Sequence, residues 1–164
     1  KQVWENILRD DYDNWDVPTL QEEYNAYKQD NPLPYKELIF PDVLKVLNEV
    51  KSRGLKIGLA SSSVKADILR ALKENHLDGF FDVVLSGEEF KESKPNPEIY
   101  LTALNQLGVK PNQALIIEDS EKGIAAGVAA GVEVWAIKDN RFGMDQGAAK
   151  GLLDNLIDVL DLLE

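Results

Sequence analysis

Hydrophobic positions in residues 41–139 follow two alternating patterns. Nearly continuous apolar runs lie within residues 56–63, 80–89, 114–120 and 132–139, and each predicts a short buried strand. Amphipathic segments separate or precede these runs, at residues 41–54, 64–76, 97–108 and 120–131, and they predict helices. Strands that alternate with helices predict βαβ units. We therefore expect an α/β fold with a parallel sheet covered by helices on both faces.

The two ends of the chain show helical spacing. In residues 1–30, Trp4, Ile7 and Leu8 share one helical face, and Thr19 with Glu22 has the form of a capping box, so a helical hairpin is expected. Residues 30–41 contain three prolines and predict a linker. Near the C-terminus a helical stripe predicts a closing helix, with Leu153, Leu156, Ile157, Leu160 and Leu163.

Composition narrows the function classes. A chain of 164 residues suits a single core, and its net charge of −11 is a poor match for nucleic acid or anionic lipid. The absence of cysteine and the single histidine, His76, exclude a thiolate site and a multi-histidine zinc site. His76 is expected on the surface near a helix end. No apolar run reaches the roughly 20 residues of a membrane span, and no signal-peptide pattern opens the chain, so we expect a cytoplasmic protein.

Polar side chains cluster where the predicted strands end. Ser61, Ser62 and Ser63 follow one strand directly before a helix, a place suited to an anion. Glu118 and Asp119 follow another strand and offer oxygen ligands for a hard cation. In a third loop, Lys94 precedes a helix that begins with Pro97, and a lysine there suits a phosphate.

Each of these features also has a structural explanation. The serines and the Asp119-Ser120 pair are common helix caps, and exposed lysines are frequent. The serines, Lys94 and the acidic pair lie together at one edge of the predicted sheet, and this favours a metal-assisted phosphoryl-transfer site. Of the parts that such a site needs, only the nucleophile is missing. Three glycines four residues apart, Gly123, Gly127 and Gly131, predict close packing of their helix on the sheet.

The ordered set LASSS, SKPNPEIY and IIEDSEKGIAAGVAAG resembles the haloacid dehalogenase superfamily, and more closely its branch with a helical cap that contains β-phosphoglucomutase-like phosphatases. The resemblance implies a Rossmann-like parallel sheet flanked by helices over residues 37–164, and a partial helical cap over residues 1–36. Residue by residue, it implies that Ser61 and Lys94 bind the transferring phosphoryl group. It also implies that Glu118 and Asp119 hold Mg²⁺, and that Ser62, Ser63 and Lys65 lie where substrate or phosphate is contacted.

One motif of that family is missing. Its members carry an Asp-x-Asp after the first strand, and the first aspartate attacks phosphorus. In this chain DDYDNWD (10–16) has the letters, but its context predicts a helix. We therefore expect a core that lacks its first strand, and no catalysis by residues 1–164 alone. The place of that strand should then be filled by a bound N-terminal piece, by a swapped segment or by direct closure of the two flanking strands.

The resemblance implies a Mg²⁺-dependent phosphatase that forms an aspartyl-phosphate on a small phosphorylated metabolite, sugar phosphates included. A β-phosphoglucomutase-type hexose-phosphate mutase is the first alternative. Val64 and Lys65 follow the serines where the mutases hold a second phosphate; a valine is a poor ligand there, although Lys65 could substitute. A catalytically silent binding module on the same fold is the second alternative. A receiver-type signalling domain fits less well, because its acidic pair lies early in the chain. Neither the substrate nor the oligomeric state can be read from these residues.

Overall fold

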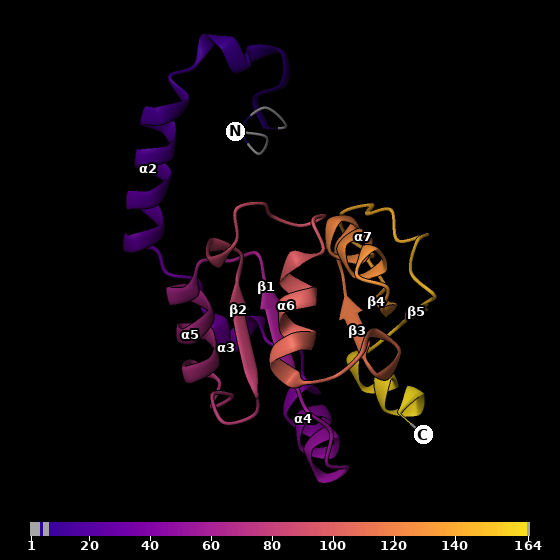
Figure 1. Cartoon of the computed structure of the whole chain (residues 1–164). Coiled ribbons are helices and arrows are strands. Elements are labelled where there is room, and N and C mark those ends of the chain that lie inside the picture. The colour runs from indigo at the N-terminus through magenta and orange to yellow at the C-terminus, as the bar shows by residue number, and fades with distance from the viewer. Residues whose placement is uncertain (1–3, 5–6, 164) are drawn as a thin grey trace. The chain divides into compact units, whose positions relative to one another are not determined.

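The computed structural model describes Trp4 and residues 7–163, and the chain divides into two compact units, residues 1–35 and 36–164. The N-terminal unit is helical, with a 3₁₀ helix η1 (Arg9–Asn14) and an α-helix α2 (Val17–Asp30) (Figure 1). No helix in the described part of the chain is long and apolar enough to span a membrane.

The start of α2 corrects one prediction. Thr19 does not cap the helix, because α2 begins at Val17 and Asp16 is the residue that precedes it. The Thr19 hydroxyl instead donates to the Asp16 carboxylate at 2.6 Å. Proline is favoured in the first helical turn, so Pro18 lies inside the helix rather than before it. Residues 1–3 and 5–6 of the predicted hairpin lie outside the described residues.

Five short strands form the core of the C-terminal unit, and every pair is parallel. Strand β1 (Gly58–Ser61) pairs with β2 (Val83–Ser86). Strand β4 (Glu133–Ile137) lies between β3 (Leu115–Glu118) and β5 (Gly151–Leu153). Within the described residues β1 and β3 do not pair, so direct closure of these two strands is not observed.

Helices cover both faces of the strands, as Figure 1 shows. Helices α6 (Glu98–Leu107) and α7 (Glu121–Ala129) pack on one face through a cluster that includes Leu85 and Ala126. On the other face, α4 (Val43–Ser52) and α5 (Lys65–Glu74) enclose Leu59 and Val84. The α/β fold with a parallel sheet and flanking helices is therefore confirmed.

Buried side chains hold the two groups of strands in one layer. Helix α4 places Val46 against β3, β4 and the C-terminal residues, and it places Val43 and Leu47 against β1 and β2. On the opposite face, the Leu85 cluster joins β2 to α6 and α7. These helices pack across the boundary between β1 and β3. The hydrophobic core is therefore continuous there, although no backbone hydrogen bonds join the two strands.

Two predictions needed correction here. Residues 35–38 form a short helix α3 (Tyr35–Leu38) inside the segment expected to be a linker. The C-terminal stripe does not form one helix: Leu153 ends strand β5, and a 3₁₀ helix η4 (Leu156–Leu162) follows. The leucines still face the core, because β5 pairs with the edge of β4 and η4 then packs on α4.

Two more 3₁₀ turns are η2 (Gly87–Glu89) and η3 (Pro111–Gln113).

Candidate active site

The turn from β3 into α7 presents the acidic pair. Glu118 is the last residue of β3, and Ser120 caps α7 by accepting a hydrogen bond from the Gly123 amide at 3.1 Å. One Glu118 oxygen, Oε2, accepts hydrogen bonds from the Asp119 amide at 3.0 Å and from the Ser120 hydroxyl at 3.1 Å. A Cβ at Gly123 would overlap the Glu118 carboxylate, so glycine is needed there for the carboxylate to lie over the start of the helix.

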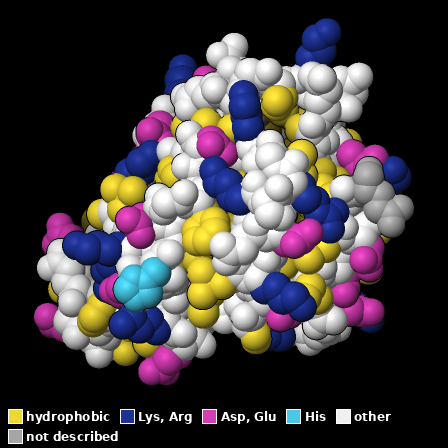
Figure 2. Space-filling model, turned by 90° about the horizontal axis from the view of Figure 1, so that it is seen from below, with side chains coloured by type: hydrophobic (Ala, Val, Ile, Leu, Met, Phe, Trp, Pro, Cys, Tyr) yellow, Lys and Arg dark blue, Asp and Glu magenta, His cyan; other side chains and the backbone are white. Residues whose placement is uncertain are grey.

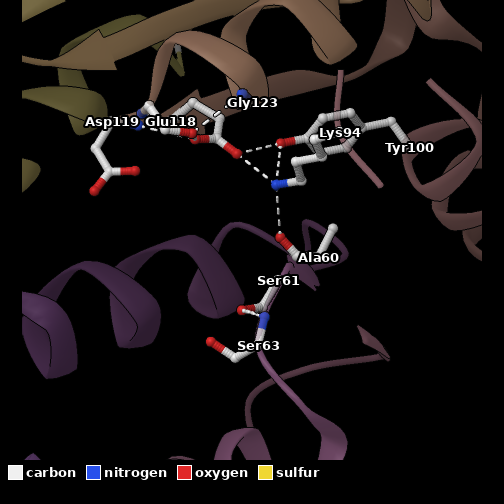
Figure 3. Close-up of polar contacts among 9 residues, drawn as sticks. Ala60, Ser61, Ser63, Lys94, Tyr100, Glu118, Asp119 and Gly123 are labelled. Carbon is white, nitrogen blue, oxygen red and sulfur yellow. Dashed lines mark hydrogen bonds and ion pairs between the residues drawn. The ribbon is translucent and has the colours of Figure 1, made fainter. Parts of the chain in front are cut away.

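Lys94 directs its ammonium toward this carboxylate. Its side chain is 7% exposed, and Nζ lies 2.5 Å from Glu118 Oε1 and 3.1 Å from the carbonyl oxygen of Ala60 (Figure 3). The loop before α6 is ordered by Asn96, whose side chain accepts from the Glu98 amide at 2.9 Å. The lysine thus joins the end of β1 to the end of β3, and its ammonium is buried between them.

Tyr100, on α6, completes a buried three-residue contact. Its hydroxyl lies 2.8 Å from Lys94 Nζ and donates to Glu118 Oε1 at 2.5 Å. Burial, then the charge of Glu118, raises the pKa of the Tyr100 phenol, which therefore stays neutral. Burial alone would also raise the pKa of the Glu118 carboxyl, but Lys94 and the hydrogen bonds outweigh it and hold that pKa below its ordinary value. The site therefore holds an ionised lysine–glutamate pair.

Asp119 faces the other way. In Figure 3 its carboxylate points away from Lys94 and Tyr100. Within the described part of the chain it has no ion-pair partner. Desolvation by the surrounding protein and the adjacent negative charge of Glu118 raise the pKa of the Asp119 carboxyl. A cation placed beside it would relieve this unfavourable charge.

The serine cluster forms the turn after β1. The Ser61 hydroxyl accepts from the Ser63 amide at 3.1 Å, and Ser62 and Ser63 are exposed. The fully buried Ser86, at the end of β2, donates its hydroxyl hydrogen to the Ser63 carbonyl at 2.7 Å. Ser61 directly follows Ala60, whose carbonyl contacts Lys94, so the structure brings Ser61, Lys94 and the acidic pair to the same end of the strands.

Lys65 lies apart from this group. Its ammonium contacts the Val84 carbonyl at 2.6 Å and Glu89 at 3.3 Å, while its backbone amide donates to Glu88. Its suggested role in binding phosphate remains a prediction, and it would require this ammonium to leave Glu89.

His76 lies on the surface, as predicted. It follows the end of α5 with a positive φ of 57° and is exposed. Figure 2 shows the histidine, in cyan, on the face seen from below, among basic and acidic side chains. That face lies at the opposite ends of the strands from Ser61 and Asp119 (Figure 1).

Sequence reasoning missed three side chains that shape the site. These are Tyr100, Ser86 and Gln146, and each is buried. Tyr100 stood within the SKPNPEIY segment, and its position six residues after Lys94 was the available signal. Ser86 and Gln146 carried no comparable signal, because their partners come from other parts of the chain.

Comparison with known proteins identifies the family. The profile described as haloacid dehalogenase-like hydrolase matches residues 1–137. The chain belongs to the haloacid dehalogenase-like hydrolases. A phosphorylated carbohydrates phosphatase of Thermotoga maritima is 36% identical over 113 residues, which cover 66% of this chain and 52% of that protein. Pyrophosphatase PpaX of Bacillus cereus is 30% identical over 162 residues, covering 95% and 74% of the two chains. This hydrolase chain thus spans about half the length of the first of these relatives.

Solved structures agree with this family. A Thermotoga maritima protein assigned as a β-phosphoglucomutase has 32% identity and a TM-score of 0.69, over 75% of this chain and 58% of that one. CbbY of Rhodobacter sphaeroides, solved with phosphate, has 28% identity and a TM-score of 0.63, over 71% and 53%. A phosphatase of this superfamily from Thermococcus onnurineus has 26% identity and a TM-score of 0.68, over 85% and 70%.

The donor set of the hydrolase fits a magnesium ion. Magnesium binds one or two carboxylates and keeps several water molecules or phosphate oxygens as its remaining ligands. Among the described residues no group of three or more acidic, histidine or cysteine side chains could hold a metal ion, and Glu118 and Asp119 are an adjacent pair of carboxylates at the strand ends. Both Glu118 oxygens already accept hydrogen bonds, whereas the Asp119 carboxylate has no cation, so Asp119 is the better direct ligand.

Proposed function

We propose that the full protein is a Mg²⁺-dependent phosphatase that hydrolyses a small phosphorylated metabolite. The observation that carries the proposal is the buried Lys94, whose ammonium is held between Ala60 at the end of β1 and Glu118 at the end of β3. Burying an ammonium is costly unless it is paired and hydrogen-bonded, and this one has three oxygen partners. These contacts fix the Lys94 ammonium at the ends of β1 and β3, which is where the proposed phosphate would lie.

Each residue of the group then has one role. The Ser61 hydroxyl, which accepts from the Ser63 amide and has its own hydrogen to donate, binds a phosphate oxygen near the start of α5. Lys94 neutralises charge that grows on the transferring group, and because Glu118 and Tyr100 fix it, it needs no rearrangement during the reaction. Asp119, beside Glu118, holds the metal. When bound, Mg²⁺ supplies positive charge to the phosphate oxygens.

We further propose that the nucleophilic aspartate lies on a strand between β1 and β3, outside residues 1–164. Two facts support this placement: β1 and β3 are unpaired with each other within the described residues, and Lys94 bridges their ends. The carboxylates of residues 10–16 belong to η1 and the start of α2, and no strand precedes them in the described chain. Residues 1–164 by themselves are then inactive.

Water is the proposed acceptor of the phosphoryl group. A mutase would need a second phosphate site after the serines, and Lys65 is the available cation there. Lys65 directs its ammonium to Val84 and Glu89, apart from the group formed by Ser61, Lys94 and the acidic pair. The likeness to the Thermotoga maritima protein assigned as a β-phosphoglucomutase keeps the mutase as the second candidate.

The test is hydrolysis of p-nitrophenyl phosphate by the full protein with and without Mg²⁺. Asp119→Asn should lower kcat/KM by about 100-fold or more, because it removes a ligand charge. Asp161→Asn, at an exposed carboxylate on η4, is the matched control and should leave activity unchanged. Full activity in excess chelator, or in Asp119→Asn, would refute the proposal. Transfer of phosphate to a hexose phosphate instead of water, followed by ³¹P NMR, would establish the mutase.

A further inference from the structure

Gln146 is a buried polar side chain that the proposed chemistry does not use. It belongs to the segment that connects β4 to β5 along the chain, and it is 9% exposed. Its amide nitrogen donates to the carbonyl oxygens of Asp119 at 2.9 Å and Ile137 at 2.8 Å. Its amide oxygen accepts from the Asp139 backbone amide at 2.9 Å. Two acceptors and one donor around the group determine the orientation of the amide.

The Asp119 backbone depends on this contact. Glu118 is the last residue of β3 in the ladder with β4, so Asp119 lies just beyond the paired backbone. Its amide donates to Glu118 Oε2 at 3.0 Å, and its carbonyl accepts from Gln146. Because both peptide groups of Asp119 are held by side chains, its φ and ψ angles are restricted. The direction of its Cα–Cβ bond, and hence of its carboxylate, follows from those angles.

The segment that carries Gln146 is itself held in place. The Asp139 carboxylate accepts hydrogen bonds from the amides of Arg141, Phe142 and Met144, at 2.9, 3.0 and 2.8 Å. These contacts fold the chain back, so that Gln146 reaches the Asp139 amide and the end of β4 together. A side chain 27 positions away from Asp119 thereby gains a fixed place beside it.

We propose that Gln146 is a positioning residue that sets the Asp119 carboxylate for a divalent cation. This inference rests on the metal assignment in the proposed function. A primary amide is needed, since only it donates to two carbonyls and accepts from an amide at the same place. Methionine has a similar length but cannot form these hydrogen bonds. Glutamate keeps the acceptor, but its charge would face two carbonyl oxygens.

The experiment measures Mn²⁺ binding to the purified chain by electron paramagnetic resonance, because Mn²⁺ takes the same oxygen ligands as Mg²⁺. The variants are Gln146→Met, Gln146→Glu and Asp119→Asn. Gln113→Met is the matched control: the Gln113 side chain accepts from the Lys110 amide at 3.1 Å, just before β3 and far from Asp119 along that strand. Circular dichroism and thermal unfolding are recorded for each variant.

We expect both Gln146 variants to bind Mn²⁺ about 10-fold more weakly or worse, as is usual when a residue that orients a metal ligand is lost. Gln113→Met should bind like the wild type. Wild-type affinity in both Gln146 variants, with weakened binding in Asp119→Asn, would overturn the positioning role alone. Equal binding by wild type and Asp119→Asn would overturn the metal assignment and this inference with it. If neither Gln146 variant folds, the residue is structural and the inference is wrong.

Discussion

At the residue level, Lys94 and Glu118 form a buried ion pair. Both side chains are less than 10% exposed, and their charged atoms lie 2.5 Å apart. Burial opposes the ionised carboxylate, and the lysine charge together with hydrogen bonds from Tyr100 and the Asp119 amide overcomes this opposition. Lys94 therefore helps to keep the buried Glu118 carboxyl ionised.

Removing the lysine alone should destabilise the fold as well as stop catalysis. Lys94→Met leaves a buried carboxylate without a cation, which costs about 3–5 kcal/mol of unfolding free energy. The double variant Lys94→Met/Glu118→Gln should recover most of this loss and remain inactive. Urea unfolding of the wild type, both single variants and the double variant measures the coupling. A double variant no more stable than Lys94→Met would contradict the buried pair.

The Tyr100 hydroxyl should contribute to both stability and turnover. Tyr100→Phe removes its hydrogen bond to Glu118 and its contact with Lys94 while keeping the ring in the core. We expect about 1–2 kcal/mol less unfolding free energy. We also expect a roughly 10-fold lower kcat in the full protein, equivalent to about 1.4 kcal/mol. Tyr27→Phe, whose ring is 64% exposed, is the control. Unchanged kcat in Tyr100→Phe would show that the hydroxyl does not hold the lysine in place.

At the level of elements, glycines let α7 approach the strands. A Cβ at Gly127 would lie 2.6 Å from Val134 and 3.1 Å from Ile116, and Gly123 faces Glu118. The predicted close packing is thus present at two of the three glycines. Gly131 has a φ of 74° and lies after the helix, where a turn requires this conformation.

Gly127→Ala should therefore destabilise the protein although alanine favours helices. The added methyl must displace Val134 in a packed core, at a cost of about 1–3 kcal/mol. Gly79→Ala is the control, because nothing lies within 4 Å of a Cβ at that position. Thermal unfolding of the two variants decides the matter: equal melting temperatures would mean that α7 moves away without cost.

Asp82 links three elements and should make stability depend on pH. Its carboxylate accepts from the Ile57 amide at 2.7 Å, just before β1, and contacts Lys51 on α4 at 3.2 Å. The Ile57 and Lys51 contacts lower the pKa of Asp82 below its ordinary value of 3.8. The contribution to stability is therefore present above about pH 4 and is lost as pH falls through the lowered pKa.

The expected result is a difference between wild type and Asp82→Asn in urea unfolding at several pH values. The variant should be less stable at pH 7, and the difference should shrink below pH 4, where the wild-type carboxylate takes up its proton. Asp161→Asn provides the control. A constant difference at all pH values would mean that the Asp82 charge has no part in the contact.

At the level of the whole core, helices hold together two groups of strands that do not share a ladder. The unpaired edges of β1 and β3 leave backbone groups without strand partners within the described residues. Buried groups of this kind cost roughly 1–3 kcal/mol each when nothing satisfies them. The interval between β1 and β3 therefore lacks backbone hydrogen bonds between strands, and it lies beside the site.

Hydrogen exchange of residues 1–164 should report this lack of hydrogen bonds. Amides of β4, paired on both sides, should exchange slowly. Alternate amides of β1 and β3 should exchange much faster, because they face the edge where no ladder forms. In the full protein the same amides should become protected if a strand enters between them. Equal protection of β1, β3 and β4 in residues 1–164 would contradict the proposed strand position.

The sequence by itself determined the order of the core elements and the polar positions at the strand ends. Apolar runs and amphipathic segments are local signals, and parallel strands carry their carboxyl ends to one edge. This is why the sequence predicts Ser61, Lys94, Glu118 and Asp119 as one group. Helix ends were equally local: the helix expected within residues 97–108 ends at Gly108, which has a φ of 69°.

Only the tertiary structure decided which partners these residues take. Tyr100 reaches Glu118 across 18 positions and Gln146 reaches Asp119 across 27, and no periodic pattern records such contacts. The same holds for Lys65, whose partner Glu89 lies on a different element, and for Leu153, which joined a strand because β4 offered a free edge. Periodicity reports the face that a residue buries, whereas hydrogen-bond partners depend on how distant segments meet, because these bonds form only over about 3 Å and in a fixed direction.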